Sequence, residues 1–149
     1  MVGNVEKLRM HVLSNEALLV ITAVVDIAIN GRDTPAKSDE VATRLGVSRH
    51  ALEPAIRSLS RGGIVTSPDG AGGGYRLARD ASDISVADIL RAGGFLEACN
   101  GELDNPILAR TMDLPALLVA GKAFAKQVSG ISLARLVRAA ASQGSLIGL

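Results

Sequence analysis

The chain has 149 residues, of which 48% are hydrophobic, 21% are charged and only 2% are aromatic, and its formal net charge is +1. These values are typical of one small globular domain, alone or with an appendage, whose core is aliphatic and therefore favours helices over a β-sandwich. The longest apolar run, residues 17–29, is interrupted by Thr22 and Asp26, which argues against a membrane-spanning protein.

The N-terminus and the cysteine content restrict the location and the possible sites. No small-residue cleavage pattern follows the N-terminal apolar stretch, so we expect no signal peptide and a cytoplasmic protein. Cys99 is the single cysteine of the chain. It cannot form an intrachain disulfide, nor supply the several thiolates of a structural zinc site or an ordinary iron–sulfur site.

The first predicted element is a helix over residues 14–29. Its apolar residues recur at spacings of three and four, which predicts one buried stripe. Asn30 and Gly31 end this helix, and residues 32–37, which include Pro35, are predicted to form a loop. The residues of the stripe are Leu18, Ile21, Val24, Val25 and Ala28.

Two shorter helices are predicted over residues 38–45 and 48–61. Ser38 and Ser48 are the predicted N-caps, and Gly46 separates the two helices. Pro54 lies inside the second helix, where it removes one backbone hydrogen bond and is expected to cost up to about 3 kcal/mol or to kink the helix.

A β-hairpin is predicted next, with strands over residues 64–67 and 75–78 and a glycine-rich tip between them. Ser85 and Asp88 then form a capping-box pattern at the start of a helix that Gly93 ends. Residues 131–138 repeat the pattern of residues 84–91, which indicates a shared way of starting a helix rather than a repeat architecture.

A helix is also predicted over residues 114–128, after an acidic, turn-rich connector. Its only polar side chains are those of Lys122, Lys126 and Gln127. A helix with so few polar side chains needs more burial than a small domain offers. We therefore expect it to pack against a second subunit. Ala116 and Ala120 would allow two such helices to approach closely.

Charge is unevenly distributed along the chain. Residues 38–79 hold six basic and four acidic residues, residues 80–113 two basic and seven acidic, and residues 114–149 four basic and none acidic. A basic middle segment suits a nucleic-acid interface, although uneven charge is common in helical proteins.

The order of these elements predicts a winged helix-turn-helix that binds DNA. The second of the two short helices can lie in the major groove, where its N-terminal amides bind a phosphate and Arg49 and His50 reach base edges or backbone. Arg57 and Arg61 are expected to contact phosphates, and the hairpin is the wing. The candidate DNA-binding residues are Ser38, Ser48, Arg49, His50, Arg57, Arg61, Gly73, Gly74, Tyr75 and Arg76.

Three other interpretations apply to parts of this pattern. Taken singly, the arginines could form a solvated helix face and the glycines an ordinary turn. An enzyme is disfavoured because residues 70–74 lack the Lys-Ser/Thr that follows a phosphate-binding loop, and because no acid or nucleophile is placed beside His11 or His50. A winged helix used only for protein–protein contact would be expected to lose the basic residues of its recognition helix.

The sequence resembles the Rrf2 family of winged-helix bacterial transcriptional regulators. The resemblance is strongest over roughly residues 14–92 and rests on Leu52-Glu53-Pro54, on Gly73-Gly74-Tyr75-Arg76-Leu77-Ala78 and on Ile84-Ser85-Val86-Ala87-Asp88-Ile89. It implies a mainly α fold with a small β-hairpin wing: a winged helix-turn-helix domain over residues 1–92, then a connector, a long dimerisation helix and a C-terminal helix over residues 93–149.

The resemblance also implies a homodimeric regulator, usually a repressor, that reads a pseudo-palindromic operator on double-stranded DNA. The helix after the winged domain would cross to the partner subunit. The expected dimer-interface residues are Leu114, Leu117, Leu118, Ala120 and Phe124.

The sequence departs from the family pattern at two places. Many members carry three cysteines that bind an iron–sulfur cluster, whereas this chain has only Cys99, so we expect no cofactor and no metal. Cys99 is a candidate redox sensor, a plain core residue, or one ligand of a mixed site with Glu97, Glu102 or Asp104. A small molecule and a thiol reagent are both open as effectors, and the sequence does not identify the signal. In the wing, Asp69 and Gly72 stand where many relatives have basic residues, which weakens the expected contact with phosphates.

Overall fold

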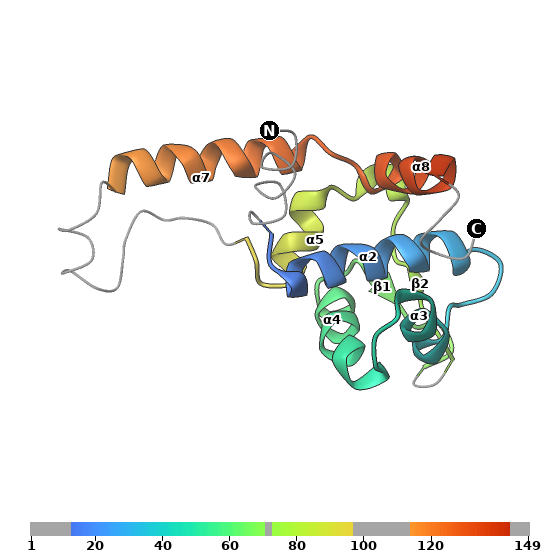
Figure 1. Cartoon of the computed structure of the whole chain (residues 1–149). Helices are drawn as coiled ribbons and strands as arrows, with labels where there is room; N and C mark the ends of the chain where they lie inside the picture. Colours follow the sequence, from blue (N-terminus) through green and yellow to red (C-terminus); the bar gives the residue numbers. More distant parts are fainter. Residues whose placement is uncertain (1–12, 71–72, 97–113, 144–149) are drawn as a thin grey trace.

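The computed structural model of the chain describes residues 13–70, 73–96 and 114–143. Within these ranges the chain forms six α-helices, one short 3-10 helix and a two-stranded antiparallel sheet (Figure 1). The predicted class, mainly α with a small β-hairpin wing, is confirmed. Among the described residues, no helix combines the length and apolar character needed to cross a membrane.

Helix α2, Asn15–Asn30, is the centre of the fold. The side chain of Ser14 caps it by accepting a 3.1 Å hydrogen bond from the backbone N–H of Ala17. Figure 1 shows α2 running between the helix-turn-helix on one side and helices α5 and α8 on the other, and it contacts all of them. Residues 23–28 of α2 are buried without interruption, so both sides of this helix face a core.

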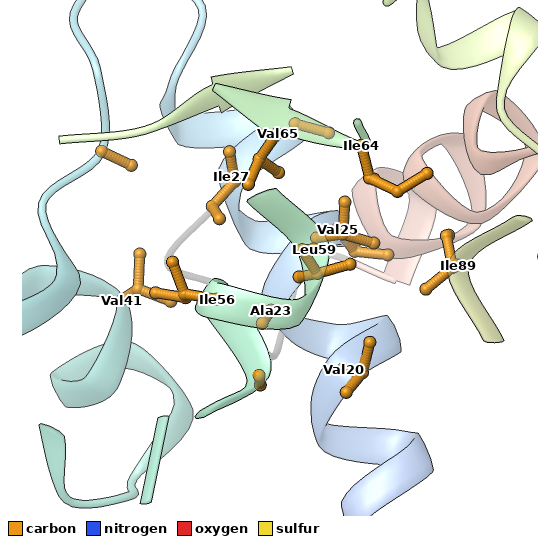
Figure 2. Close-up of a cluster of buried hydrophobic side chains, with 14 of the residues drawn as sticks. Val20, Ala23, Val25, Ile27, Val41, Ile56, Leu59, Ile64, Val65 and Ile89 are labelled. Carbon is orange, nitrogen blue, oxygen red and sulfur yellow. The ribbon is translucent and has the colours of Figure 1, made fainter. Parts of the chain in front are cut away.

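Aliphatic side chains from five helices and the hairpin form one hydrophobic cluster around α2. Figure 2 shows part of it, in which Val25 and Ile27 of α2 lie near Leu59 and Val65. A core of this kind stabilises the domain chiefly through the apolar area that it removes from water. Its labelled members are Val20, Ala23, Val25, Ile27, Val41, Ile56, Leu59, Ile64, Val65 and Ile89.

The helix-turn-helix consists of α3, Ser38–Leu45, and α4, Arg49–Arg61. Gly46 ends α3 in the left-handed conformation, with φ of 69°, as its position between the helices predicts. The prediction that Ser38 caps α3 is wrong. The cap is Lys37, which makes no side-chain capping bond, because the chain already enters the helix one residue earlier and Ser38 lies inside the first turn.

Two features of α4 were predicted from the sequence. Ser48 is its N-cap, with its hydroxyl oxygen accepting a 3.1 Å hydrogen bond from the N–H of Ala51. Pro54 lies inside α4, and the helix continues through it from Arg49 to Arg61. The missing hydrogen bond is therefore tolerated without a break in the helix.

The wing is a hairpin of β1, Val65–Thr66, and β2, Arg76–Leu77. Val65 pairs with Leu77 and Thr66 with Arg76. The strands are shorter than predicted, because Tyr75 pairs with Ala36, in the loop before α3, through two backbone hydrogen bonds of 2.8 Å. The wing is therefore joined to the chain segment that leads into the helix-turn-helix.

Helices α5, Val86–Ala92, and α8, Leu133–Gln143, begin side by side. The predicted capping box is present, with Ser85 and Asp88 bonding each other's backbone at 3.0 Å. Ser85 also pairs with Ser132, and two 2.8 Å backbone bonds join Val86 to Ile131 and Leu133 to Ile84. The two segments whose patterns match in the sequence are thus hydrogen-bonded to each other.

This pairing places α8 on α2, where Leu133 and Val137 are buried in the cluster of Figure 2. The 3-10 helix η1, Ala81–Asp83, lies between β2 and α5 in the chain and contacts α8. The predicted boundary between the winged-helix domain and the C-terminal part, after residue 92, stays a prediction for the whole chain. Within the described residues, however, α8 shares one core with the winged helix.

Helix α7, Leu114–Ser129, extends away from the other helices (Figure 1). Among the described residues, α7 packs on the domain through its C-terminal end, where Val128 and the half-buried Phe124 lie against α5. Leu117 is 49% exposed and Val119 is 68% exposed. An apolar helix with this exposure has the surface expected of a subunit interface.

Candidate nucleic-acid interface

Helix α4 is held so that one side is buried and the other faces solvent. Leu52, Ala55, Ile56 and Leu59 are buried in the core, at the three- and four-residue spacing of a helix face. The basic side chains Arg49, His50, Arg57 and Arg61 are all exposed. The fold therefore presents the basic face of α4 outward, as a recognition helix requires.

Arg49 is not free at the N-terminus of this helix. Its Nη1 lies 3.3 Å from Oδ1 of Asp39 on α3, and its Nε lies 3.4 Å from Oε1 of Glu53, one turn further along α4. Its side chain is 62% exposed, so these pairs are screened by water and contribute little to stability. They do hold the guanidinium, which must exchange a carboxylate for a DNA group if it is to contact DNA.

A hollow of about 350 Å3 lies between α4 and the wing. We call it the α4 cavity. It brings together five of the predicted DNA-binding residues, and the carboxylate of Glu53 and the hydroxyl of Ser60 also border it. An arginine-lined hollow next to a helix in the major groove is suited to a phosphate group. The five predicted residues are Ser38, Arg49, Arg57, Arg61 and Tyr75.

The structure places the other five predicted residues outside the α4 cavity. Ser48 and His50 are exposed at the start of α4, where they remain accessible. Gly74 is buried with φ of +90°, and a Cβ atom there would lie 2.8 Å from the carbonyl oxygen of Pro35. The absence of a side chain at Gly74 therefore allows a close contact with the backbone of Pro35 inside the protein. Gly73 is half-buried, and Arg76 lines a different cavity, described below.

Beneath the helix-turn-helix lies a buried ion pair that the sequence did not indicate. Asp26 of α2 is fully buried, and Arg44 of α3 binds it with two 2.8 Å hydrogen bonds, from Nε to Oδ1 and from Nη2 to Oδ2. Nδ2 of Asn30 donates a further 3.0 Å bond to Oδ1. These bonds fix α3, and with it the start of α4, to the central helix.

The hydrogen bonds to Asp26 raise the pKa of the Arg44 guanidinium above its ordinary value, against the lowering effect of burial. Arg44 therefore stays charged across the pH range in which proteins fold. In the sequence, Asp26 counted only as an interruption of an apolar run. The usable signal is that a carboxylate inside a buried helix needs a cationic or hydrogen-bonding partner.

The dimer-interface prediction and the cysteine prediction fall partly outside the described residues. Cys99, the acidic residues beside it and the side chain of Leu114 lie outside the part of the chain that the structure describes. The described part of the chain contains no group of three or more His, Cys, Asp or Glu side chains arranged to hold a metal ion. A cluster held by three thiolates does not fit this chain, because its sequence contains one cysteine.

The order of α2, α3, α4, hairpin and α5, with a long helix beyond, can be compared with known proteins. The family model Rrf2, described as an iron-dependent transcriptional regulator, matches residues 13–139. The chain belongs to the Rrf2 family. The predicted family membership is thereby confirmed.

Curated relatives give the same assignment. The protein named rrf2 of Nitratidesulfovibrio vulgaris is 36% identical over 121 residues, which cover 77% of this chain and 79% of that protein. The HTH-type transcriptional regulator IscR of Photobacterium profundum is 36% identical over 80 residues, which cover 54% of this chain and 46% of that regulator. The match thus spans about half the length of the IscR relatives.

Solved structures agree with the fold. IscR of T. potens superposes with a TM-score of 0.68 at 28% identity, covering 89% of this chain and 90% of that one. CymR of Staphylococcus aureus superposes with a TM-score of 0.63 at 22% identity, covering 83% and 96%, a likeness that shows the fold alone. The predicted winged-helix, DNA-binding transcriptional regulator is confirmed, and so is the prediction that the chain is not an enzyme.

Proposed function

We propose that this Rrf2 family member is a homodimeric repressor that acts in the cytoplasm and reads a pseudo-palindromic operator. The observation that carries the proposal is the solvent-facing basic side of α4, which shares one cavity with Tyr75 of the wing. In a dimer, two such α4 helices would enter successive major grooves of the operator.

Within this proposal the residues have different roles. His50, and Arg49 once it is released from Asp39 and Glu53, are placed at the start of α4 to read base edges. Arg57 and Arg61 lie further along the same helix and bind phosphates, which fixes the register of the protein on DNA. Ser48 caps the start of α4 by accepting from the N–H of Ala51, and the remaining backbone amides of the first turn bind a phosphate.

The binding experiment uses a fluorescent fragment of the promoter of the protein's own gene and measures affinity between 50 and 200 mM salt, roughly the range over which phosphate contacts dominate. Wild-type protein is compared with Arg57→Gln, Arg61→Gln and the matched control Arg135→Gln, which neutralises an exposed arginine on α8. Each substitution removes one phosphate contact from each subunit, so we expect each α4 variant to lower the slope of log K against log salt by about 1.8 for the dimer, roughly 0.9 per contact. Equal slopes in all four proteins would contradict the assigned interface.

The proposed dimer rests on α7. Leu117, Phe124 and Val128 lie on one side of this helix, because they are seven and four residues apart. The end of that side packs on α5 through Phe124 and Val128, whereas Leu117 is exposed. We assign the exposed continuation of this side to the partner subunit, with the predicted interface residues Leu114, Leu117, Leu118 and Ala120, whereas the predicted interface residue Phe124 is half-buried against α5 of its own chain.

Sedimentation velocity tests this assignment. Leu117→Lys should convert the dimer to monomer, since it places a charge within the proposed apolar interface. Ala139→Lys adds the same charge at an exposed position of α8 and should leave the dimer intact. A wild-type protein that sediments as a monomer, or equal dissociation of both variants, would refute the interface.

For the cofactor we propose that the regulator works without a cysteine-ligated iron–sulfur cluster, because one thiolate cannot hold one in the usual way. Iron analysis and absorbance of anaerobically purified protein test this directly. The candidate redox role of Cys99 is tested in the same binding assay with and without a thiol oxidant. Loss of DNA binding in wild-type protein but not in Cys99→Ser would establish a thiol switch, and oxidant-independent binding by both would exclude it.

A further inference from the structure

A second cavity, of about 340 Å3, lies between the C-terminal end of α2, strand β2, η1 and α8. We call it the α2–β2 cavity. It shares no lining residue with the α4 cavity. Its lining residues are Ile27, Ala28, Gly31, Arg32, Arg76, Leu77, Arg79, Asp80, Ala81 and Val137.

The lining of this cavity divides into a cationic part and an apolar part. Arg32, Arg76 and Arg79 contribute three guanidinium groups, against the single carboxylate of Asp80. Aliphatic side chains, among them Leu77, form the remaining wall. A cavity with an apolar wall and a few converging polar groups is the usual form of a small-molecule site.

Arg76 is the group that most requires a partner here. Its Nε is buried, and no described residue accepts a hydrogen bond from it. A buried donor without an acceptor is costly, and such groups in folded proteins call for an explanation. A small rotation of this guanidinium toward the cavity would let one carboxylate accept from Nε and Nη together, the bidentate geometry that arginine prefers.

The other charged groups of the cavity are partly engaged. Nε of Arg32 donates to the carbonyl oxygen of Ala28 at 3.4 Å, which leaves the rest of its guanidinium available. Arg79 is turned to the carbonyl of Asp83 at 3.2 Å and to the carboxylate of Asp88 at 3.9 Å. Arg32 and Arg76 are therefore the groups with donors to offer.

Asp80 contributes the one negative charge of the lining, and its side chain is held by its own turn. Its Oδ1 accepts 2.9 Å and 2.7 Å hydrogen bonds from the backbone N–H and the hydroxyl of Ser82. The side chain is thereby held as the cap of η1. The three guanidiniums of the lining outnumber this single carboxylate, so the lining carries a net positive charge.

We propose that the α2–β2 cavity binds a small carboxylate with a short apolar body. Arg76 and Arg32 hold the carboxylate group, and the aliphatic wall formed by Ile27, Leu77 and Val137 covers the apolar body. The site shares no lining residue with the α4 cavity, and Arg76 is the one predicted DNA-binding residue that lines it.

As a regulatory site, the cavity rests on the proposed DNA-binding function. Arg76 directly follows Tyr75, which borders the α4 cavity and pairs with Ala36 before α3. Gly31 packs so tightly on this strand that a Cβ atom there would lie 2.8 Å from the carbonyl oxygen of Tyr75. A ligand that draws Arg76 toward α2 therefore acts on the strand that positions Tyr75 beside the recognition helix.

The test uses hexanoate as the probe, with full-length protein in the absence of DNA and at constant ionic strength. The arginine Nε–H signals are followed by 1H–15N NMR during the titration, and succinate and inorganic phosphate are titrated in parallel. We expect saturable hexanoate binding that shifts the Nε–H signal of Arg76. Arg76→Gln and Arg32→Gln should each weaken binding by about tenfold or more, whereas Arg135→Gln should not change it.

Any different result overturns the proposed site or one stated part of it. No saturable shift of the Arg76 signal in wild-type protein refutes the site, whether or not the variants fold. Equal weakening by Arg135→Gln means non-specific attraction to positive charge. Phosphate binding as tightly as hexanoate refutes the role of the apolar wall.

DNA affinity with and without saturating hexanoate is measured separately. An unchanged affinity would refute the regulatory role while leaving the site intact. Because hexanoate binding is measured without DNA, failure of the proposed DNA-binding function would be seen independently of this site.

Discussion

The ion pair of Asp26 and Arg44 makes a sharp prediction, since one partner is fully buried and the other is not. Arg44→Met keeps an unbranched apolar stem but removes both 2.8 Å bonds to Asp26. Asp26 would then keep only the 3.0 Å bond from Asn30. A buried charge that loses its partner typically costs about 3–5 kcal/mol.

That loss is large for a domain of this size. Folded domains are stable by about 5–15 kcal/mol, so Arg44→Met should remove a substantial share of the free energy of unfolding. For a chain of roughly this length it corresponds to a fall in Tm of about 6–20 °C. The double variant Asp26→Leu/Arg44→Met removes both charges, and it should come within about 1 kcal/mol of wild type or exceed it.

Urea unfolding followed by circular dichroism at pH 7 measures these differences. The matched control is Arg91→Met, which removes a 3.5 Å pair with Asp88 whose arginine side chain is 51% exposed. Exposed pairs contribute about 0–1 kcal/mol, so this control should change stability little. If Arg44→Met costs no more than Arg91→Met, or if the double variant is the least stable of the set, the reasoning from burial is wrong.

Three further predictions concern packing, capping and pH. Gly62→Ala should destabilise the protein by about 1–3 kcal/mol in the same urea assay, because its Cβ would lie 2.5 Å from that of Ala92 on α5; unchanged stability would contradict the close approach of α4 and α5. Ser85→Ala should cost about 0.5–2 kcal/mol by removing the N-cap of α5, and Ser85→Thr should restore most of it. Hydrogen bonds from the backbone and side chain of Ser82 lower the pKa of Asp80 below its ordinary 3.8. The ionised Asp80 therefore stabilises the fold above pH 3.8, and this contribution is lost as the pH falls through the lowered pKa. In pH-dependent unfolding, the stability difference between wild type and Asp80→Asn should therefore be constant near neutral pH and shrink in acid, and a difference that grows in acid would reverse the assigned sign.

Local signals in the sequence predicted most of the elements. Ser48 caps α4 where predicted, and the predicted capping box of Ser85 and Asp88 is present. These devices act within three or four residues, so they are readable without knowing the fold. The misassigned cap at Ser38 shows the limit of this approach, since the pairing of Ala36 with the distant Tyr75 sets how the chain enters α3.

Features that depend on long-range contacts could not be predicted. The sequence separates Asp26 from Arg44 by 18 residues, and nothing local indicates which cation meets a buried carboxylate. The same holds for Arg76, which is predicted to contact DNA from the wing and whose place in the α2–β2 cavity nothing local indicates. For the candidate interface, the basic face of α4 was predicted because helical periodicity defines it, whereas the engagement of Arg49 by Asp39 depends on how α3 packs on α4.

The docking of α8 on α2 has a consequence for how the chain is made. Leu133 and Val137 complete a hydrophobic core whose first members lie about a hundred residues earlier. During synthesis, the winged helix can assemble its local elements early, but part of α2 stays uncovered until the chain beyond α7 has left the ribosome. The DNA-binding end and the C-terminal end of the protein are therefore completed together, and a nascent chain that stops short of α8 would display an apolar patch open to chaperones and proteases.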